Sequence, residues 1–465
     1  MKTFSNKIPR ANPRFFPAAV ILFVLCPRLC ADTGGALILE RANSNENIYS
    51  SATGDFISYL RGDVAFRYDD IRITSDEATW QKSMGIVDFR KNITVEQKGQ
   101  VMTCDRLHFV RDNNMLTASG NVVYQDSAKI TFLRGNTAEY ATDRKECLLR
   151  GNPLLTRLDT TGVDTLFISG RTMKYNDSLK IANVTFNVNI RRGGLNATSK
   201  KGDYFLNTNI ALLRLDPVIY YEKHKVVGDS VDLFFGKESL KGACVTGNAH
   251  GYYTEVADSS KDTTVTHIWS DSLYLSMYES GKVNSMKAFG SARGSYAETS
   301  ASGNAMTTNI SSDSLHMFMF ETGKVSAMKA FGNAHGRSAE WSASSASKDS
   351  AITHIWSDSL RVSISEAGKI HSMRAFGNVE SKNFVLGDSA RANEVSGRTM
   401  TLAFGDNGKI EKAVVRGDAK SIYYIEEADG GGCNRAGGDR ITVTFQMGKA
   451  KKLQVRGNAK GIYFP

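Results

Sequence analysis

Hydrophobic and polar residues alternate along short stretches of this chain. Leu273, Leu275 and Met277 take every second position, which is the two-residue period of a strand with one buried face. Ile268 and Leu273 differ in parity, so one face can hold both only if the chain is irregular near Asp271. We expect a β-bulge there. No helical period of useful length follows residue 31, so the pattern predicts an all-β protein.

The pattern recurs in two anchors along most of the chain. The first is an Asp followed by an alternating apolar strand, and the second is a Gly-Asn/Asp-Val/Ala step. The Asp anchors are Asp76, Asp105, Asp229, Asp271, Asp313, Asp358 and a partial Asp439, with Asn136, Arg171, Lys200 and Arg398 in weaker copies. The glycine anchors are Gly62, Gly120, Gly151, Gly247, Gly332, Gly377, Gly417 and Gly457.

The pattern of each repeat predicts two strands joined by a tight turn. The units are about 30 residues long before Gly247 and about 40 to 45 after it. Turns such as 279–282, 321–324 and 366–369 contain a glycine that is free to take positive φ. The extra length of the later units lies in polar stretches, 299–308 and 342–350, which we interpret as surface loops.

One such unit cannot bury its apolar face alone, but stacked units form a continuous core. The sequence therefore predicts an elongated β-jelly-roll, or two-walled solenoid slab, of stacked antiparallel strands. The first and last strands would be open edges that can accept another strand.

These residues resemble a known family. The phased Gly-Asn-Val/Ala steps, Arg150-Gly-Asn-Pro153 and Ile168-Ser-Gly-Arg-Thr-Met-Lys-Tyr175 are similar to the OstA-like family, whose LptA-type members are periplasmic lipopolysaccharide-transport proteins. The resemblance covers roughly residues 36–465, as a first domain over 36–205 and a second over 206–465.

The resemblance implies a jelly roll whose apolar interior shields lipid A acyl chains. It also implies head-to-tail joining of OstA-like domains or of copies of this chain, so that a bridge links the inner and outer membranes and serves outer-membrane assembly. The implied partners are lipopolysaccharide and other OstA-like domains.

Two sets of candidate site residues follow. The inward rows expected to contact lipid, or else to pack as core, are Leu273, Leu275, Met277, Leu315, Met317, Leu360 and Val362. The edge positions expected to join another domain are Leu37, Ile38, Leu39, Ile462, Tyr463 and Phe464.

The N-terminal segment has the composition of a secretory signal. Lys2, Lys7, Arg10 and Arg14 precede an apolar run of eleven residues, 15–25. That order is typical of a signal peptide, and the run is shorter than the roughly 20 residues that span a membrane. We expect residues 1–31 to be cleaved and the mature chain to be periplasmic. The alternative is an uncleaved anchor.

The net charge and the cysteines do not identify a ligand or a site. Without residues 1–31 the chain has 53 basic and 48 acidic residues, about +5, spread without the basic block that nucleic-acid binding needs. Cys104, Cys147, Cys244 and Cys433 lack metal-ligand spacing, and both disulfides and isolated thiols stay open.

No catalytic, metal or cofactor site is expected. Basic residues replace Asp in some repeats, which favours a structural turn role over calcium binding. The histidine pairs His250/His335 and His267/His354 follow the repeat and lack metalloprotease spacing. The leading hypothesis is a non-enzymatic lipopolysaccharide-transport scaffold. The alternatives are a structural or adhesive cell-surface β-solenoid and, more remotely, a polysaccharide-active enzyme.

Overall fold

The computed structural model describes residues 35–464, with gaps at 159–164, 223, 237–238, 257–262, 302–304, 342–350, 385–391, 407–408, 426–431 and 447–448. The predicted signal segment, residues 1–31, lies outside the described residues.

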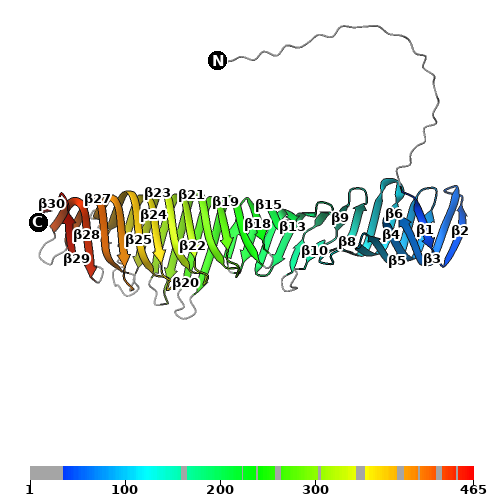
Figure 1. Cartoon of the computed structure of the whole chain (residues 1–465), viewed down its shortest axis with the longest axis horizontal. Helices are drawn as coiled ribbons and strands as arrows, with labels where there is room; N and C mark the ends of the chain where they lie inside the picture. Colours follow the sequence, from blue (N-terminus) through cyan, green and yellow to red (C-terminus); the bar gives the residue numbers. More distant parts are fainter. Residues whose placement is uncertain are drawn as a thin grey trace, which may run out of the picture.

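The predicted fold class is confirmed. Within the described residues thirty strands form one continuous antiparallel sheet, rolled into a long body with β2 (Ser44–Ser50) at one tip and β30 (Lys460–Phe464) at the other (Figure 1). Within the described residues the helical structure is one 3₁₀ turn, Arg111–Asn113, and no helix is long and apolar enough to cross a membrane.

The first section has long strands behind a divided edge. They are β1 (Leu37–Arg41), β2 (Ser44–Ser50), β3 (Asp55–Tyr68), β4 (Ile71–Gln81), β5 (Ile86–Gln97), β6 (Gln100–Val110), β7 (Met115–Gln125) and β8 (Thr131–Ala141).

The middle section is built mostly from pairs of short strands. They are β9 (Glu146–Arg150), β10 (Leu154–Arg157), β11 (Leu166–Ser169), β12 (Thr172–Asn176), β13 (Ile181–Arg192), β14 (Leu195–Phe205), β15 (Ile210–Arg214), β16 (Val218–Tyr221), β17 (His224–Val227) and β18 (Ser230–Phe235).

The last section returns to long strands, each paired with the next, and ends in a second divided edge. They are β19 (Leu240–Val256), β20 (Thr263–Met277), β21 (Val283–Thr299), β22 (Ala305–Met319), β23 (Val325–Trp341), β24 (Ala351–Ile364), β25 (Ile370–Phe384), β26 (Ala392–Phe404), β27 (Ile410–Ile425), β28 (Gly432–Gln446), β29 (Lys449–Arg456) and β30 (Lys460–Phe464).

Each long strand bends at a corner, and the corner is the predicted bulge. Opposite Asp271 on β20, strand β19 inserts both Gly247 and Asn248, with φ of 73° and 47°. Two residues facing one is a β-bulge, and positive φ is tolerated best by Gly and Asn. Because the parity changes here, Ile268 before the corner and Leu273 after it are both buried.

The repeated aspartates hold these corners together. The Asp313 carboxylate lies across Gly332, and the Asn333 side-chain amide donates to it at 3.2 Å. The same arrangement recurs at Asp358 with Asn378. These contacts agree with the structural role expected for the aspartates from the sequence.

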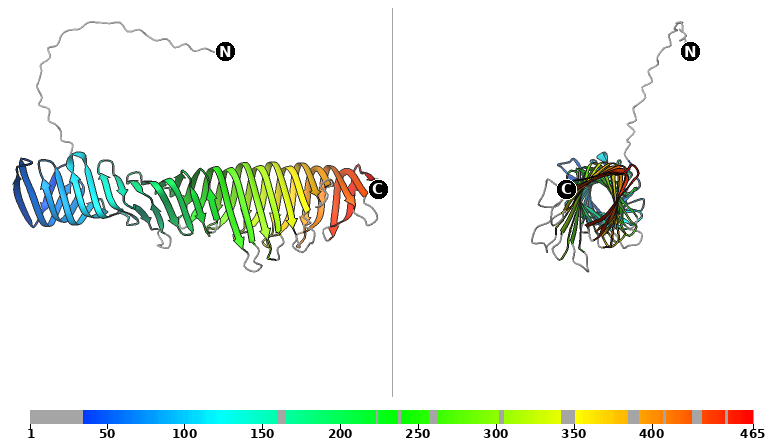
Figure 2. Two further views of the ribbon diagram at one scale, coloured as in Figure 1. Left: turned by 180° about the vertical axis from the view of Figure 1, so that it is seen from behind. Right: turned by 90° about the vertical axis from the view of Figure 1, so that its left-hand side faces the viewer.

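The corners divide the sheet into two facing walls (Figure 2). We call the arms that carry Leu273, Leu315 and Leu360 the leucine wall. The arms that carry Gly251, Gly294 and Gly336 form the glycine wall. A Cβ at Gly294 would lie 2.7 Å from Leu315 Cδ2. Because glycine has no side chain, Leu315 of one wall can pack closely against the other wall at this position.

The structure bears differently on the predicted surface loops and on the predicted domain boundary. The stretch 299–308 is not all loop, because β21 continues to Thr299 and β22 begins at Ala305, so part of the extra repeat length extends strands. The domain division at 205/206 stays a prediction. The hairpin β14–β15 crosses it within the continuous sheet, and two units joined end to end would share a sheet in the same way.

The corner generates a prediction. Gly332→Ala places a Cβ 2.1 Å from Asp313 Oδ2 at φ 73°, so it should destabilise the fold by about 1 to 3 kcal/mol from backbone strain, with the clash in addition. Thermal unfolding followed by circular dichroism measures the loss. Gly368→Ala is the control, since Gly368 has φ 82° and nothing within 4 Å. Adding Asp313→Ala to Gly332→Ala should recover the clash part. Equal losses for Gly332→Ala and Gly368→Ala would show that the corner contact contributes nothing.

Candidate lipid-binding interior and edge strands

The leucine positions predicted from sequence face the interior. Leu273, Leu315 and Leu360 are 0%, 0% and 3% exposed. They belong to one row that pairs strand by strand along the whole sheet. Its members after β18 are Val245, Leu273, Ala288, Leu315, Ala330, Leu360, Ala375, Met400, Val415 and Ile441.

A second inward row is rich in methionine. It contains the predicted Leu275, Met317 and Val362 together with residues the prediction missed, Met286, Met328 and Met373. Met277 lies one step further on, beside a hairpin turn. Methionine side chains adapt to irregular neighbours, so this side of the interior is its most deformable part. The structure brings these residues together, and their contact with lipid stays a prediction.

The open side between the walls is closed by tyrosines. We call Tyr68, Tyr124, Tyr140, Tyr221 and Tyr253 the tyrosine seam, because each hydroxyl reaches from one wall to the other. The hydroxyl donors and their acceptors are Tyr68 to Asn114 Oδ1, Tyr124 to Asp177 Oδ1, Tyr140 to Gln97 Oε1, Tyr221 to the Gly281 carbonyl and Tyr253 to the Gly323 carbonyl.

Sequence reasoning missed the seam. Each tyrosine lies near a strand end, and its partner is 43 to 70 residues away. The local alternation pattern holds no signal for contacts at that separation.

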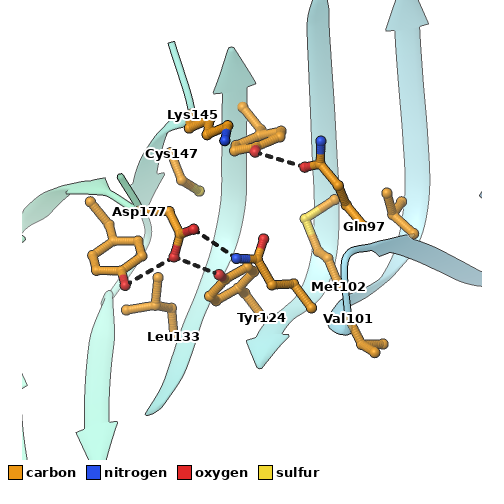
Figure 3. A pocket seen from close by; sticks show the side chains of 12 residues that line it. Gln97, Val101, Met102, Tyr124, Leu133, Lys145, Cys147 and Asp177 are labelled. Atoms are coloured by element: carbon orange, nitrogen blue, oxygen red, sulfur yellow. Dashed lines mark hydrogen bonds between the residues drawn. The ribbon is translucent and has the colours of Figure 1, made fainter. Parts of the chain in front are cut away.

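The middle of the seam is a polar network around Asp177 (Figure 3). Its carboxylate accepts from Gln100 Nε2 at 2.7 Å, Lys180 Nζ at 2.6 Å and the Tyr124 hydroxyl at 3.0 Å. Burial disfavours the charged form, but the hydrogen bonds from Lys180 and Gln100 outweigh it and hold the pKa of Asp177 below its usual value. Asp177 is therefore a fixed anion that ties the two walls together.

The space behind this network is small. A cavity of about 30 Å³ lies among Met102, Tyr124, Leu133 and Cys147, which suits water-sized groups rather than an acyl chain. Burial raises the pKa of Tyr140 and of Cys147 to about 12, so both stay protonated at neutral pH. At this place the closed seam leaves no room for an acyl chain.

The N-terminal edge is longer than predicted. Leu37 and Leu39 pack against the core, while Ile38 is 43% exposed. Strand β1 covers only one arm of β3, and β2 pairs with the other arm. The sequence of β2, SNENIYS, lacks apolar alternation, so the pattern did not reveal it.

The C-terminal edge has the same divided form. Strands β29 and β30 cover the two arms of β28. Ile462, Tyr463 and Phe464 are 60%, 57% and 45% exposed. The structure thus places the predicted residues in the two terminal strands, and neither of these edges pairs with a further described strand.

The repeat-borne histidines lie on the outer face of the glycine wall. His250 and His267 are joined by a 3.0 Å hydrogen bond and stack with Trp269, and His335, His354 and Trp356 repeat this. Cross-strand packing accounts for both sets. Within the described residues no three His, Cys, Asp or Glu side chains group as metal ligands, and Cys104, Cys147, Cys244 and Cys433 are free thiols.

Comparisons with known proteins do not assign the chain to a family. No protein-family model and no curated protein matches the sequence. One solved structure with similarity is described as LptH, the LptA homologous periplasmic component of the lipopolysaccharide transport device from Pseudomonas aeruginosa. The match has 16% identity and a TM-score of 0.21, and covers 31% of this chain and 82% of that one. A TM-score this low does not establish a shared overall fold.

Proposed function

We propose that this chain is a periplasmic scaffold that carries lipopolysaccharide acyl chains between its two walls and bridges membranes through its edges. The observation that carries the proposal is the pair of unbroken apolar rows, the leucine row and the methionine row, inside a body whose two edges are uncapped. The resemblance of the sequence repeats to the OstA-like family supports lipopolysaccharide as the ligand. The proposed scaffold performs no chemistry.

The physical reason for such an interior is the cost of wetting acyl chains. Each exposed methylene costs about 0.8 kcal/mol, so a carrier must offer apolar contact along its whole length. The leucine and methionine rows do so without a polar interruption from β19 to β28. Each seam hydrogen bond contributes only about 1 kcal/mol, so acyl contacts can offset the loss of several.

The second candidate is a structural or adhesive β-solenoid, whose interior is core only. The interdigitation of Leu315 with Gly294 favours it, because the walls touch closely there. The two candidates differ in whether lipid ever reaches the methionine row.

Photocrosslinking separates the candidates. A photoreactive residue at Met317, which is 1% exposed and inward, should crosslink to lipopolysaccharide in living cells. The matched control is Asn309, on the outer face of the same strand. Crosslinks from Asn309 but not from Met317, or from neither, would leave only the solenoid.

The edges generate a separate prediction. Tyr463 is an inward position at the uncapped end, and an inward charge on an edge strand blocks strand addition. Tyr463→Lys should therefore leave the fold intact and abolish head-to-tail association, and deletion of 461–465 should do the same. Analytical ultracentrifugation measures association with itself and with OstA-like domains.

Tyr220→Lys adds the same charge at an exposed residue of β16, away from both edges, and should associate normally. A wild-type chain that stays monomeric at high concentration and binds no such domain would contradict the bridging part of the proposal.

A further inference from the structure

One repeated motif is not explained by the interior. The sequences Met286–Gly290, Met328–Gly332 and Met373–Gly377 share the pattern Met-Lys/Arg-Ala-Phe-Gly. The Met and Ala side chains point inward, so the cation and the phenylalanine point outward from the leucine wall. Stacking of the repeats therefore places three copies of each outward residue on one face.

The phenylalanines form an exposed ridge. Phe289, Phe331 and Phe376 are 38%, 42% and 45% exposed, and their strand neighbours in the same row are the short side chains of Ser and Thr. They lie two strands apart, about 10 Å. His316 links the first two rings edge to face, with centroids 5.4 and 5.3 Å away. Burial, together with Lys287 and Lys329, lowers the pKa of His316, so this link is uncharged at neutral pH.

A row of cations runs beside the ridge. Its members are Lys287, Lys329, Arg361 and Arg374. Arg361 stands directly opposite both Lys329 and Arg374, and like charges opposite one another destabilise a sheet. Among the described residues none of the four forms an ion pair.

In the first half of the chain, the charged side chains at the equivalent register positions have side-chain partners. There Asp88 pairs with His108 at 2.8 Å, and Lys174 bonds to Glu146 on the neighbouring strand at 2.9 Å. The accumulation of unpaired charge is thus particular to the later strands. The corner aspartates border the ridge on one side. The carboxylates of Asp313 and Asp358 accept hydrogen bonds from the side-chain amides of Asn333 and Asn378.

We propose that this surface, the four cations with the three phenylalanines, docks the protein on an anionic lipid bilayer. The cations meet phosphate headgroups, and the ridge enters the boundary between headgroups and acyl chains. The proposal concerns the outer face and holds whether or not the interior carries lipid.

The chemistry favours a bilayer over a soluble polyanion or an acidic protein. Charge complementarity requires an anionic partner, and a bilayer interface also offers apolar depth to Phe side chains along the whole line. The row spans β21 to β25, about 19 Å of adjacent strands, which a planar surface can meet at once. A soluble polyanion would leave the ridge in water.

Flotation of the purified mature protein with vesicles tests the proposal. It should float with vesicles of phosphatidylethanolamine and phosphatidylglycerol, should not float with phosphatidylcholine vesicles, and should detach as salt rises. Each cation near an anionic membrane contributes about fivefold to partitioning. The variant Lys287→Gln, Lys329→Gln, Arg361→Gln, Arg374→Gln should therefore partition at least ~100-fold more weakly.

A second variant, Phe289→Ser, Phe331→Ser, Phe376→Ser, should bind more weakly and lose all binding at moderate salt. Two matched controls isolate the surface. Lys91→Gln, Lys98→Gln, Lys200→Gln, Arg67→Gln removes the same charge from exposed cations elsewhere. Phe56→Ser, Phe186→Ser, Phe234→Ser removes three other exposed rings. Both controls should float as the wild type does, and circular dichroism confirms that all variants keep the sheet.

Three outcomes overturn the proposal. The first is no flotation with anionic vesicles. The second is an equal loss in the controls, which would make the effect one of net charge or general hydrophobicity. The third is binding to dextran sulfate without binding to vesicles, which would assign the surface to a soluble anionic polymer.

Discussion

The parity of the strand constrains everything else in this molecule. A strand turns successive side chains to opposite faces, so a long strand that bends into two facing walls would present polar residues to the interior on one of them. At each corner the strand that carries the Asp reverses its parity, as between Ile268 and Leu273. The Gly-Asn strand adds one residue, stays paired with it and keeps its own parity, as between Val245 and Ala249, so both arms bury their apolar side. The Asp side chain across the glycine holds that geometry, and the remaining architecture is its repetition.

The sequence was sufficient for the parts that depend on local period. The difference in parity between Ile268 and Leu273 predicted the bulge near Asp271, and the alternation at Leu273, Leu315 and Leu360 predicted the inward row. Local period could not reveal β2, whose residues are mostly polar because the outermost strand is poorly covered. The tyrosine seam was equally invisible, since its hydrogen bonds join residues far apart in the chain.

Two faces of the leucine wall therefore have separate roles in this account. Inside, the Leu and Met rows form an apolar path that is packed shut in the closed form. Outside, the motif that supplies Met286 and Met328 to that path also supplies Lys287 and Lys329 to the surface. One repeated sequence thus shapes both the interior and the proposed bilayer contact, which explains why both are richest in the same strands, β21 to β25.

In the proposed scaffold the walls separate along the tyrosine seam to admit acyl chains while the corners stay closed. Spin labels at Lys225→Cys and Glu279→Cys, which lie near Tyr221 on one wall and Gly281 on the other, report the separation of the walls at the seam by pulsed electron resonance once Cys244 and Cys433 are replaced by serine. The distance between the labels should increase when lipopolysaccharide is bound. An unchanged distance in a protein that demonstrably holds lipopolysaccharide would contradict this separation.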